Sequence, residues 1–201
     1  MTGLNPYLSP KDLKQGEDFL PDRILEVSDM RDPRIQIPTE LCARLQIACI
    51  VTNKDLEPLD DGVEFIVKTE KDVLDRMNEW CTGLTQACLD ATHSMEQVDA
   101  LVAAYVAKHF PTNAPALLAG NSVHADRAFI NKDLPQLASK LHYRILDVSS
   151  IKELGRRWYP QLGWQSKKDE AEHRALADIK ASINELRYYR QHLFKPVEPR
   201  R

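Results

Sequence analysis

Apolar and polar positions divide the chain into strand-like and helix-like stretches. Two apolar, β-branched runs at residues 47–53 and 64–68 flank a turn signal at residues 60–62, and together they predict an antiparallel hairpin. Further along, short buried-strand patterns at residues 116–120 and 143–148 alternate with helical patterns. Strands that alternate with helices after a leading hairpin predict an α/β layer fold.

Helical spacing of apolar residues marks the other segments. A capping box, Ser94 with Gln97 three positions later, opens the first helix. A second helix is expected over residues 125–140, with a break near Pro135. A third is capped by Ser149 or Ser150 and runs through Trp158, and the last extends from about residue 170 to 192. The predicted buried faces of the first and last helices are Val98, Leu101, Val102, Tyr105 and Val106, and Leu176, Ile179, Ile183 and Leu186.

The first 46 residues differ from the rest of the chain. They hold five of the twelve prolines and contain no long periodic segment. Because proline at this density discourages regular elements, we expect regular structure to begin at Ile47. The predicted organisation is an irregular segment over residues 1–46, one domain over residues 47–194 and a polar tail over residues 195–201.

Composition narrows the function classes. A chain of 201 residues with 43% hydrophobic and 28% charged residues can bury one core without disulfides. Its four cysteines form no C-x-x-C pair, so we expect reduced, mostly buried thiols. No apolar stretch is long enough to cross a bilayer and no secretory leader pattern is visible, so we expect no membrane association and an intracellular protein. The net charge of −3 argues against coating of long nucleic acid, but it leaves room for a small anionic ligand.

Two segments carry candidate chemistry. Residues 120–126 follow a predicted buried strand, where α/β proteins place ligands, and His173 and Asp178 lie near the start of the last helix. An offset of five residues leaves two helical side chains about 140° apart, so these two converge only if His173 lies at or before the first turn. A carboxylate can hold a hard cation while a neutral imidazole takes a proton from water. From spacing alone, a solvent-facing histidine and a helix-surface aspartate remain the alternative.

Longer motifs occur in order along most of the chain. They include residues 1–6, 22–26, 47–55, Leu118-Ala-Gly-Asn-Ser-Val-His-Ala-Asp-Arg127, His142-Tyr-Arg-Ile-Leu-Asp-Val-Ser149, residues 156–160, His173-Arg-Ala-Leu176 and Ile183-Asn-Glu-Leu-Arg-Tyr-Tyr-Arg190. This set resembles the oligoribonuclease family of small 3′-to-5′ exoribonucleases in the DEDDh exonuclease superfamily. The resemblance implies an RNase H-like exonuclease fold, a mixed β-sheet flanked by helices.

The resemblance also implies a two-metal hydrolysis of short RNA to 5′ mononucleotides. Four carboxylates bind two Mg²⁺ or Mn²⁺ ions in the family. By motif match, Asp126 is the third carboxylate, Asp178 is the fourth, and His173 is the general base.

Substrate contacts follow from the same match. Leu4 matches a residue that wedges against terminal bases, and Ser122, Tyr143, Arg144 and Ser149 match residues that stack on or cap a two-nucleotide substrate. The family acts as a homodimer in mitochondria or cytoplasm, with the tyrosine reaching into the partner's site. On sequence alone, Tyr143 and Ser149 are read as packing and helix-cap residues, and only the motif match favours a role in substrate binding.

The sequence departs from the family pattern near its start. The first two carboxylates belong to an Asp-x-Glu strand that precedes the position of Met1, so that first strand is missing here. Residues 7–21 and 27–46 look inserted, and the second block splits one family strand between Glu26 and Ile47. The alternative reading is therefore a catalytically inactive binding or dimerisation module.

Overall fold

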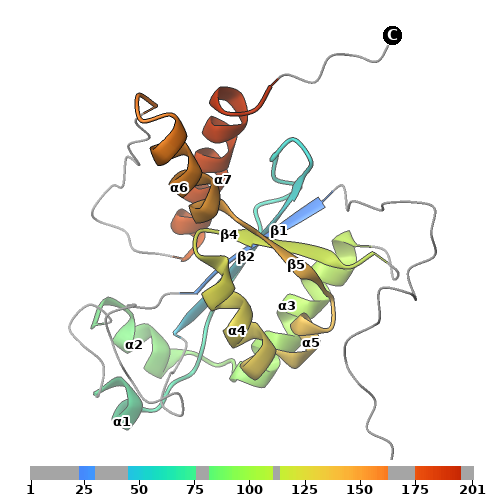
Figure 1. Ribbon diagram of the computed structural model, residues 1–201. Coiled ribbons are helices and arrows are strands. Elements are labelled where there is room, and N and C mark those ends of the chain that lie inside the picture. Colours follow the sequence, from blue (N-terminus) through green and yellow to red (C-terminus); the bar gives the residue numbers. More distant parts are fainter. Residues whose placement is uncertain (1–22, 30–44, 76–81, 111–113, 163–174, 196–201) are drawn as a thin grey trace, which may run out of the picture.

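Five strands form one mixed β-sheet in the part of the chain that the structure describes. This computed structural model describes residues 23–29, 45–75, 82–110, 114–162 and 175–195 (Figure 1). The strands are β1 (Arg23–Asp29), β2 (Gln46–Asn53), β3 (Val63–Ile66), β4 (Ala116–Gly120) and β5 (Leu141–Asp147). Their order in space is β3-β2-β1-β4-β5. β1 is antiparallel to β2 and parallel to β4, β3 is antiparallel to β2, and β5 is parallel to β4.

Helices cover both faces of this sheet, as expected for an α/β fold. The described helices are α1 (Lys71–Leu74), α2 (Thr82–Asp90), α3 (Met95–His109), α4 (Val123–Asp133), α5 (Pro135–Ala138), α6 (Val148–Trp158) and α7 (Ala175–His192). In Figure 1, α6 and α7 lie on the upper side of the sheet, and α3, α4 and α5 lie on the lower side. The hairpin and the alternation of strands with helices are therefore confirmed.

Residues of β2 alternate between the two cores because successive strand side chains point to opposite faces. Ile47, Cys49 and Val51 pack with α3, α4 and α5, whereas Ala48 and Ile50 pack with α6 and α7. With both faces covered, β2 is buried along nearly its whole length.

Polar contacts fix α3 within its layer. Ser94 and Gln97 form the predicted capping box at its start. The buried carboxylate of Asp99 accepts hydrogen bonds from the backbone N–H groups of Gln136 and Leu137, both at 2.9 Å. These bonds satisfy donors at the start of α5, which have no partner within so short a helix.

Three local predictions need correction. Regular structure does not begin at Ile47, because Arg23–Asp29 already forms the central strand. Leu101 is 41% exposed, since it lies at the margin of the apolar stripe of α3. The cap of α6 is Asp147 rather than Ser149 or Ser150, because its carboxylate accepts the N–H of Ser149.

β1 lies at the centre of the described sheet, between β2 and β4. It pairs with β2 as its antiparallel neighbour from Arg23↔Asn53 to Asp29↔Ile47. The expected insertion over residues 27–46 stays a prediction, and its first three residues lie within β1.

Two further expectations concern thiols and membranes. Cys49 and Cys88 are buried and form no disulfide among the described residues, as expected, while Cys42 and Cys81 lie outside them. Burial raises the pKa of the Cys49 thiol well above its usual range.

None of the helices in the described ranges has the length and apolar character needed to cross a membrane.

Candidate functional site

Several elements meet at one end of the sheet. β1 and β4 are parallel, so their carboxyl ends lie side by side, with Glu26 opposite Ala119. β2 runs the other way and therefore begins at this same end. The first backbone N–H of α7, from Ala175, lies 3.4 Å from Oε1 of Gln46, the first residue of β2. Consequently α4, which follows β4, and α7 both start at this end, and both pack against β1.

The predicted carboxylates Asp126 and Asp178 both belong to this end. Asp126 lies in the first turn of α4 and Asp178 in the first turn of α7, and both residues are partly buried. The sequence assigned the two residues to one site, and the structure brings their helix starts to the same edge of the sheet. His173 and Leu4 lie outside the described residues.

Two carboxylates are too few for the two-metal arrangement. Within the described ranges, no group of three or more His, Cys, Asp or Glu side chains is placed to hold a metal ion. Divalent ions of this class take six or more oxygen ligands, several of them from carboxylates or water. The described part of the chain alone therefore does not fit two such ions.

Ser122 and Ser149, two predicted substrate-binding residues, lie against each other. Their Oγ atoms are 3.2 Å apart, because Gly120 at the end of β4 pairs with Asp147 at the end of β5. The backbone N–H of Ser122 donates to Oδ1 of Asp147 at 3.0 Å and to Oγ of Ser149 at 2.9 Å. Asp147 Oδ1 also accepts the N–H of Ser149 at 2.9 Å.

These bonds hold an unusual backbone conformation. Ser122 has a φ of 53°, in the left-handed region, which costs a residue other than glycine roughly 1–2 kcal/mol. The acceptors on Asp147 and Ser149 offset that cost. The turn between β4 and α4 is thus fixed by groups from the next strand and helix, and not by its own sequence.

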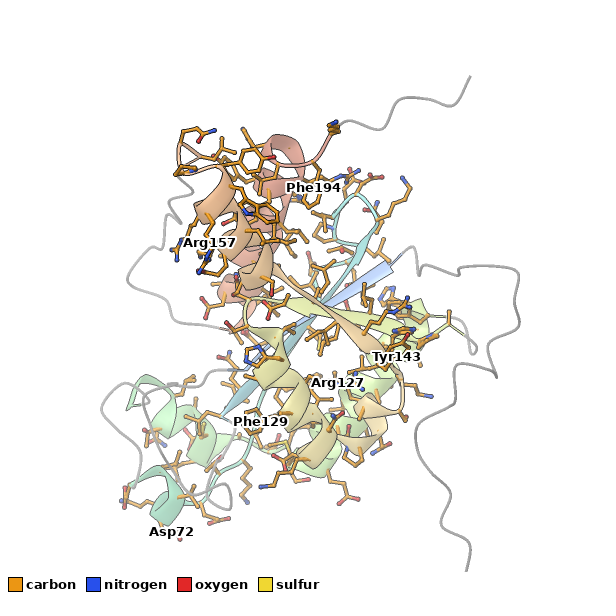
Figure 2. All side chains as sticks on the ribbon, viewed as in Figure 1. Asp72, Arg127, Phe129, Tyr143, Arg157 and Phe194 are labelled. Atoms are coloured by element: carbon orange, nitrogen blue, oxygen red, sulfur yellow. The ribbon has the colours of Figure 1, made fainter. Side chains whose placement is uncertain are left out.

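Tyr143 and Arg144 form a second, separate group on β5. Tyr143 is 64% exposed, and its ring lies 4.4 Å from the ring of His142 and 5.3 Å from the Arg144 guanidinium carbon. Figure 2 shows Tyr143 well apart from Arg157 on α6. The strand between Tyr143 and Asp147 separates the two groups by roughly 13 Å, at about 3.3 Å per residue.

His142 is held neutral beside this aromatic surface. Burial, and then the positive charges of Arg144 and Arg127, lower the pKa of His142 below its usual value of 6.5. A neutral ring keeps an acceptor nitrogen, and Nδ1 accepts the N–H of Arg144 at 3.0 Å. The surface around Tyr143 therefore carries its positive charge on arginine.

Sequence reasoning missed the buried polar residues behind Ser122 and Ser149. The Asn121 side chain donates to Ser182 Oγ and Glu185 Oε2, both at 3.0 Å, and accepts from Ser149 Oγ at 3.0 Å. Lys152 Nζ lies 2.9 Å from Glu185 Oε1. The helical pattern gave no signal for Glu185, because at about 100° per residue it lies roughly 140° around the helix from the predicted buried face.

Tyr189 completes this buried cluster. Its hydroxyl donates to Glu185 Oε1 at 2.8 Å. Burial, followed by the hydrogen bond to the Glu185 carboxylate, raises the pKa of Tyr189 well above its usual value. The phenol is therefore a permanent donor, and both oxygens of Glu185 are occupied as acceptors.

Comparisons with known proteins agree with this arrangement. The sequence profile of the RNase T exonuclease family matches residues 36–186. The mitochondrial oligoribonuclease of Bos taurus is 43% identical over 159 residues, which cover 75% of this chain and 66% of that protein. The probable oligoribonuclease of Schizosaccharomyces pombe is 35% identical over 200 residues, which cover 90% of this chain and 79% of that protein. None of these matches supports the catalytically inactive alternative.

Solved structures agree at the level of the fold. Exonuclease I of Methylocaldum szegediense superposes with a TM-score of 0.63 at 19% identity, covering 85% of this chain and 40% of that one. A 3′-exonuclease that recognises the histone mRNA stem-loop gives a TM-score of 0.59 at 20% identity, covering 85% of this chain and 64% of that one. The expected RNase H-like exonuclease fold is therefore confirmed.

Proposed function

Because this chain belongs to the oligoribonuclease family of the DEDDh exonuclease superfamily, we propose that it hydrolyses short RNA from the 3′ end to 5′ mononucleotides. The observation that carries the proposal is identity of 35% across 90% of the chain. The placement of Asp126 and Asp178 at one end of the sheet supports it, because that end is where a scissile phosphate can meet both carboxylates.

The metal requirement belongs to this proposal. Mg²⁺ or Mn²⁺, when bound, supplies a Lewis acid that stabilises charge on phosphoryl oxygens. Asp126 and Asp178 are the carboxylates proposed as ligands, and His173 is the proposed base. The described residues alone do not complete a site for two ions.

Substrate binding is assigned to two groups of residues. Ser122 offers a hydroxyl donor with Ser149 as its hydrogen-bond partner, and Leu4 offers an apolar wedge, while Tyr143 and Arg144 offer an aromatic face and a positive charge. Since Tyr143 lies apart from the serines within one chain, the proposed homodimer supplies Tyr143 from the partner. The proposed compartment is mitochondrial or cytoplasmic.

Loss of one carboxylate tests the activity. Asp178→Ala should reduce hydrolysis of a 5′-labelled diribonucleotide with Mn²⁺ by about 100-fold or more, because a proposed metal ligand is removed. Titration calorimetry with Mn²⁺ alone should show weaker binding by the same variant. The matched control is Asp90→Ala at the exposed end of α2, which should leave both quantities unchanged. Hydrolysis that survives in Asp178→Ala would exclude the metal assignment.

A further inference from the structure

The direction of the hydrogen bonds around Asn121 follows from donor and acceptor chemistry. Glu185 is only 4% exposed, and its charge is compensated by Lys152. An ionised carboxylate can only accept hydrogen bonds, so the atom of Asn121 that faces Glu185 Oε2 must be the NH₂ group. The amide oxygen of Asn121 is thereby turned toward Ser149.

This orientation commits the only hydroxyl proton of Ser149. Ser149 Oγ lies 3.0 Å from the Asn121 amide oxygen, so Ser149 donates there. Its oxygen then accepts the backbone N–H of Ser122 at 2.9 Å. Ser149 has no second proton to offer a ligand.

Ser122 is left with the mobile proton. Its Oγ lies 3.2 Å from Ser149 Oγ, and Ser149 can only accept in this contact. The Ser122 hydroxyl therefore donates either to Ser149 or to a ligand that arrives at the exposed side of this turn. The chain of bonds from Glu185 to Ser122 has one allowed direction.

We propose that Asn121 and Glu185 are positioning residues that set this direction and so make Ser122 a hydrogen-bond donor to bound RNA. The inference rests on the proposed function, because it takes a diribonucleotide as the ligand. It assigns no contact with substrate to Asn121 or Glu185, which act through Ser149 and Ser122.

An exchange of the two side-chain types tests the direction of the bonds. In Glu185→Gln, the amide oxygen must face Lys152, which can only donate, so the NH₂ group faces the Asn121 NH₂ group. Asn121 then turns over, and Ser149 loses its acceptor. The double variant Asn121→Asp/Glu185→Gln restores a donor facing an acceptor and returns a carboxylate oxygen to Ser149. It also keeps the net charge of the pair unchanged.

Two readouts separate positioning from folding. The dissociation constant of a diribonucleotide is measured by calorimetry with Ca²⁺ in place of Mn²⁺, and KM and kcat are measured with Mn²⁺. Glu185→Gln should raise the dissociation constant and KM about tenfold, the effect of one hydrogen bond, with a smaller change in kcat. The double variant should return to within about threefold of the original chain. Glu153→Gln on the exposed face of α6 is the matched control.

Each outcome is decisive. Unchanged affinity in a folded Glu185→Gln variant, or a folded double variant that binds no better than the single one, overturns the inference. If Glu185→Gln does not fold, the double variant alone decides. The inference is then overturned if the double variant also fails to fold, or if it folds but binds the diribonucleotide tenfold more weakly than the original chain. Original protein that binds the diribonucleotide without hydrolysing it contradicts the proposed activity alone, and original protein that does not bind it contradicts both.

Discussion

Gly62 lies in the turn between β2 and β3 with a φ of 81°, in the left-handed region. A Cβ atom there would lie 2.5 Å from the carbonyl oxygen of Cys49 and 2.8 Å from Cγ1 of Ile50. Gly62→Ala should therefore lower the free energy of unfolding by about 3 kcal/mol, from backbone strain and overpacking. Chemical denaturation measures the change.

Gly155 provides the matched comparison for this prediction. It lies in α6, and its added Cβ would meet only the end of the Leu193 side chain, at 3.2 Å. Alanine is favoured over glycine inside a helix by about 1 kcal/mol, so Gly155→Ala should be close to neutral or stabilising. Equal losses in both variants would refute the strain at Gly62.

Thr52 carries a buried hydroxyl that has no hydrogen-bond partner among the described residues. Thr52→Val keeps the shape and removes the unpaired oxygen, so it should raise the free energy of unfolding by about 1 kcal/mol. Thr69→Val should have the opposite effect, because the Thr69 hydroxyl donates to the carbonyl oxygen of Val67 at 3.1 Å. Thermal unfolding of the two variants compares them, and a destabilised Thr52→Val would contradict the assignment.

At the scale of elements, Asp60 joins the β2–β3 turn to α3. Its carboxylate accepts from the Tyr105 hydroxyl at 2.7 Å and the Gly62 N–H at 3.0 Å, and it lies 2.9 Å from Nε2 of His109. Burial alone would raise the pKa of Asp60, but these hydrogen bonds outweigh it and lower the pKa to about 2.

The lowered pKa of Asp60 predicts an acid-dependent loss of stability. A carboxyl with a folded pKa of about 2 and an unfolded value near 3.8 stabilises the fold above pH 4. That contribution, about 1–2 kcal/mol after solvent screening, is lost as pH falls from about 4 to 2. Denaturation curves between pH 5 and 2 should show this slope in the original protein and a shallower one in Asp60→Asn. Parallel curves would exclude the contribution.

Elements with strong local signals could be predicted from the sequence. The box at Ser94 and Gln97 located the start of α3, because its bonds form within one turn. The hydrophobic pattern missed β1, although the resemblance placed residues 23–26 in a strand, because the strands that pair with it, β2 and β4, come later in the chain. Pairing with β2 and β4 therefore had more influence on the structure of residues 23–29 than the proline-rich sequence around them.

At the scale of the whole molecule, the candidate site lies where the carboxyl ends of β1 and β4 meet the first turns of α4 and α7, which pack on opposite faces of the sheet. Motifs proposed Asp126, Ser122 and Asp178 as site residues, and the strand directions explain why the starts of α4 and α7 lie at one edge. Asn121 and Glu185 could not be paired, because they lie 64 positions apart and meet only after α7 packs on the sheet. The spacing of residues along the chain therefore cannot predict this contact.

β1 is also the only strand that joins the pair β3–β2 to the pair β4–β5 within the described sheet. The backbone amides that bond across it are shielded on both sides, so they exchange with solvent only when the sheet separates into halves. Strand alternation from Ala116 and Val51, whose amides point away from β1, turns the amides of Ala119 and Ile50 toward it. Native-state hydrogen exchange at Ala119 and Ile50 thus reports opening of the sheet at β1. β1, which the hydrophobic pattern of the sequence does not mark as a strand, therefore couples the two halves of the described sheet.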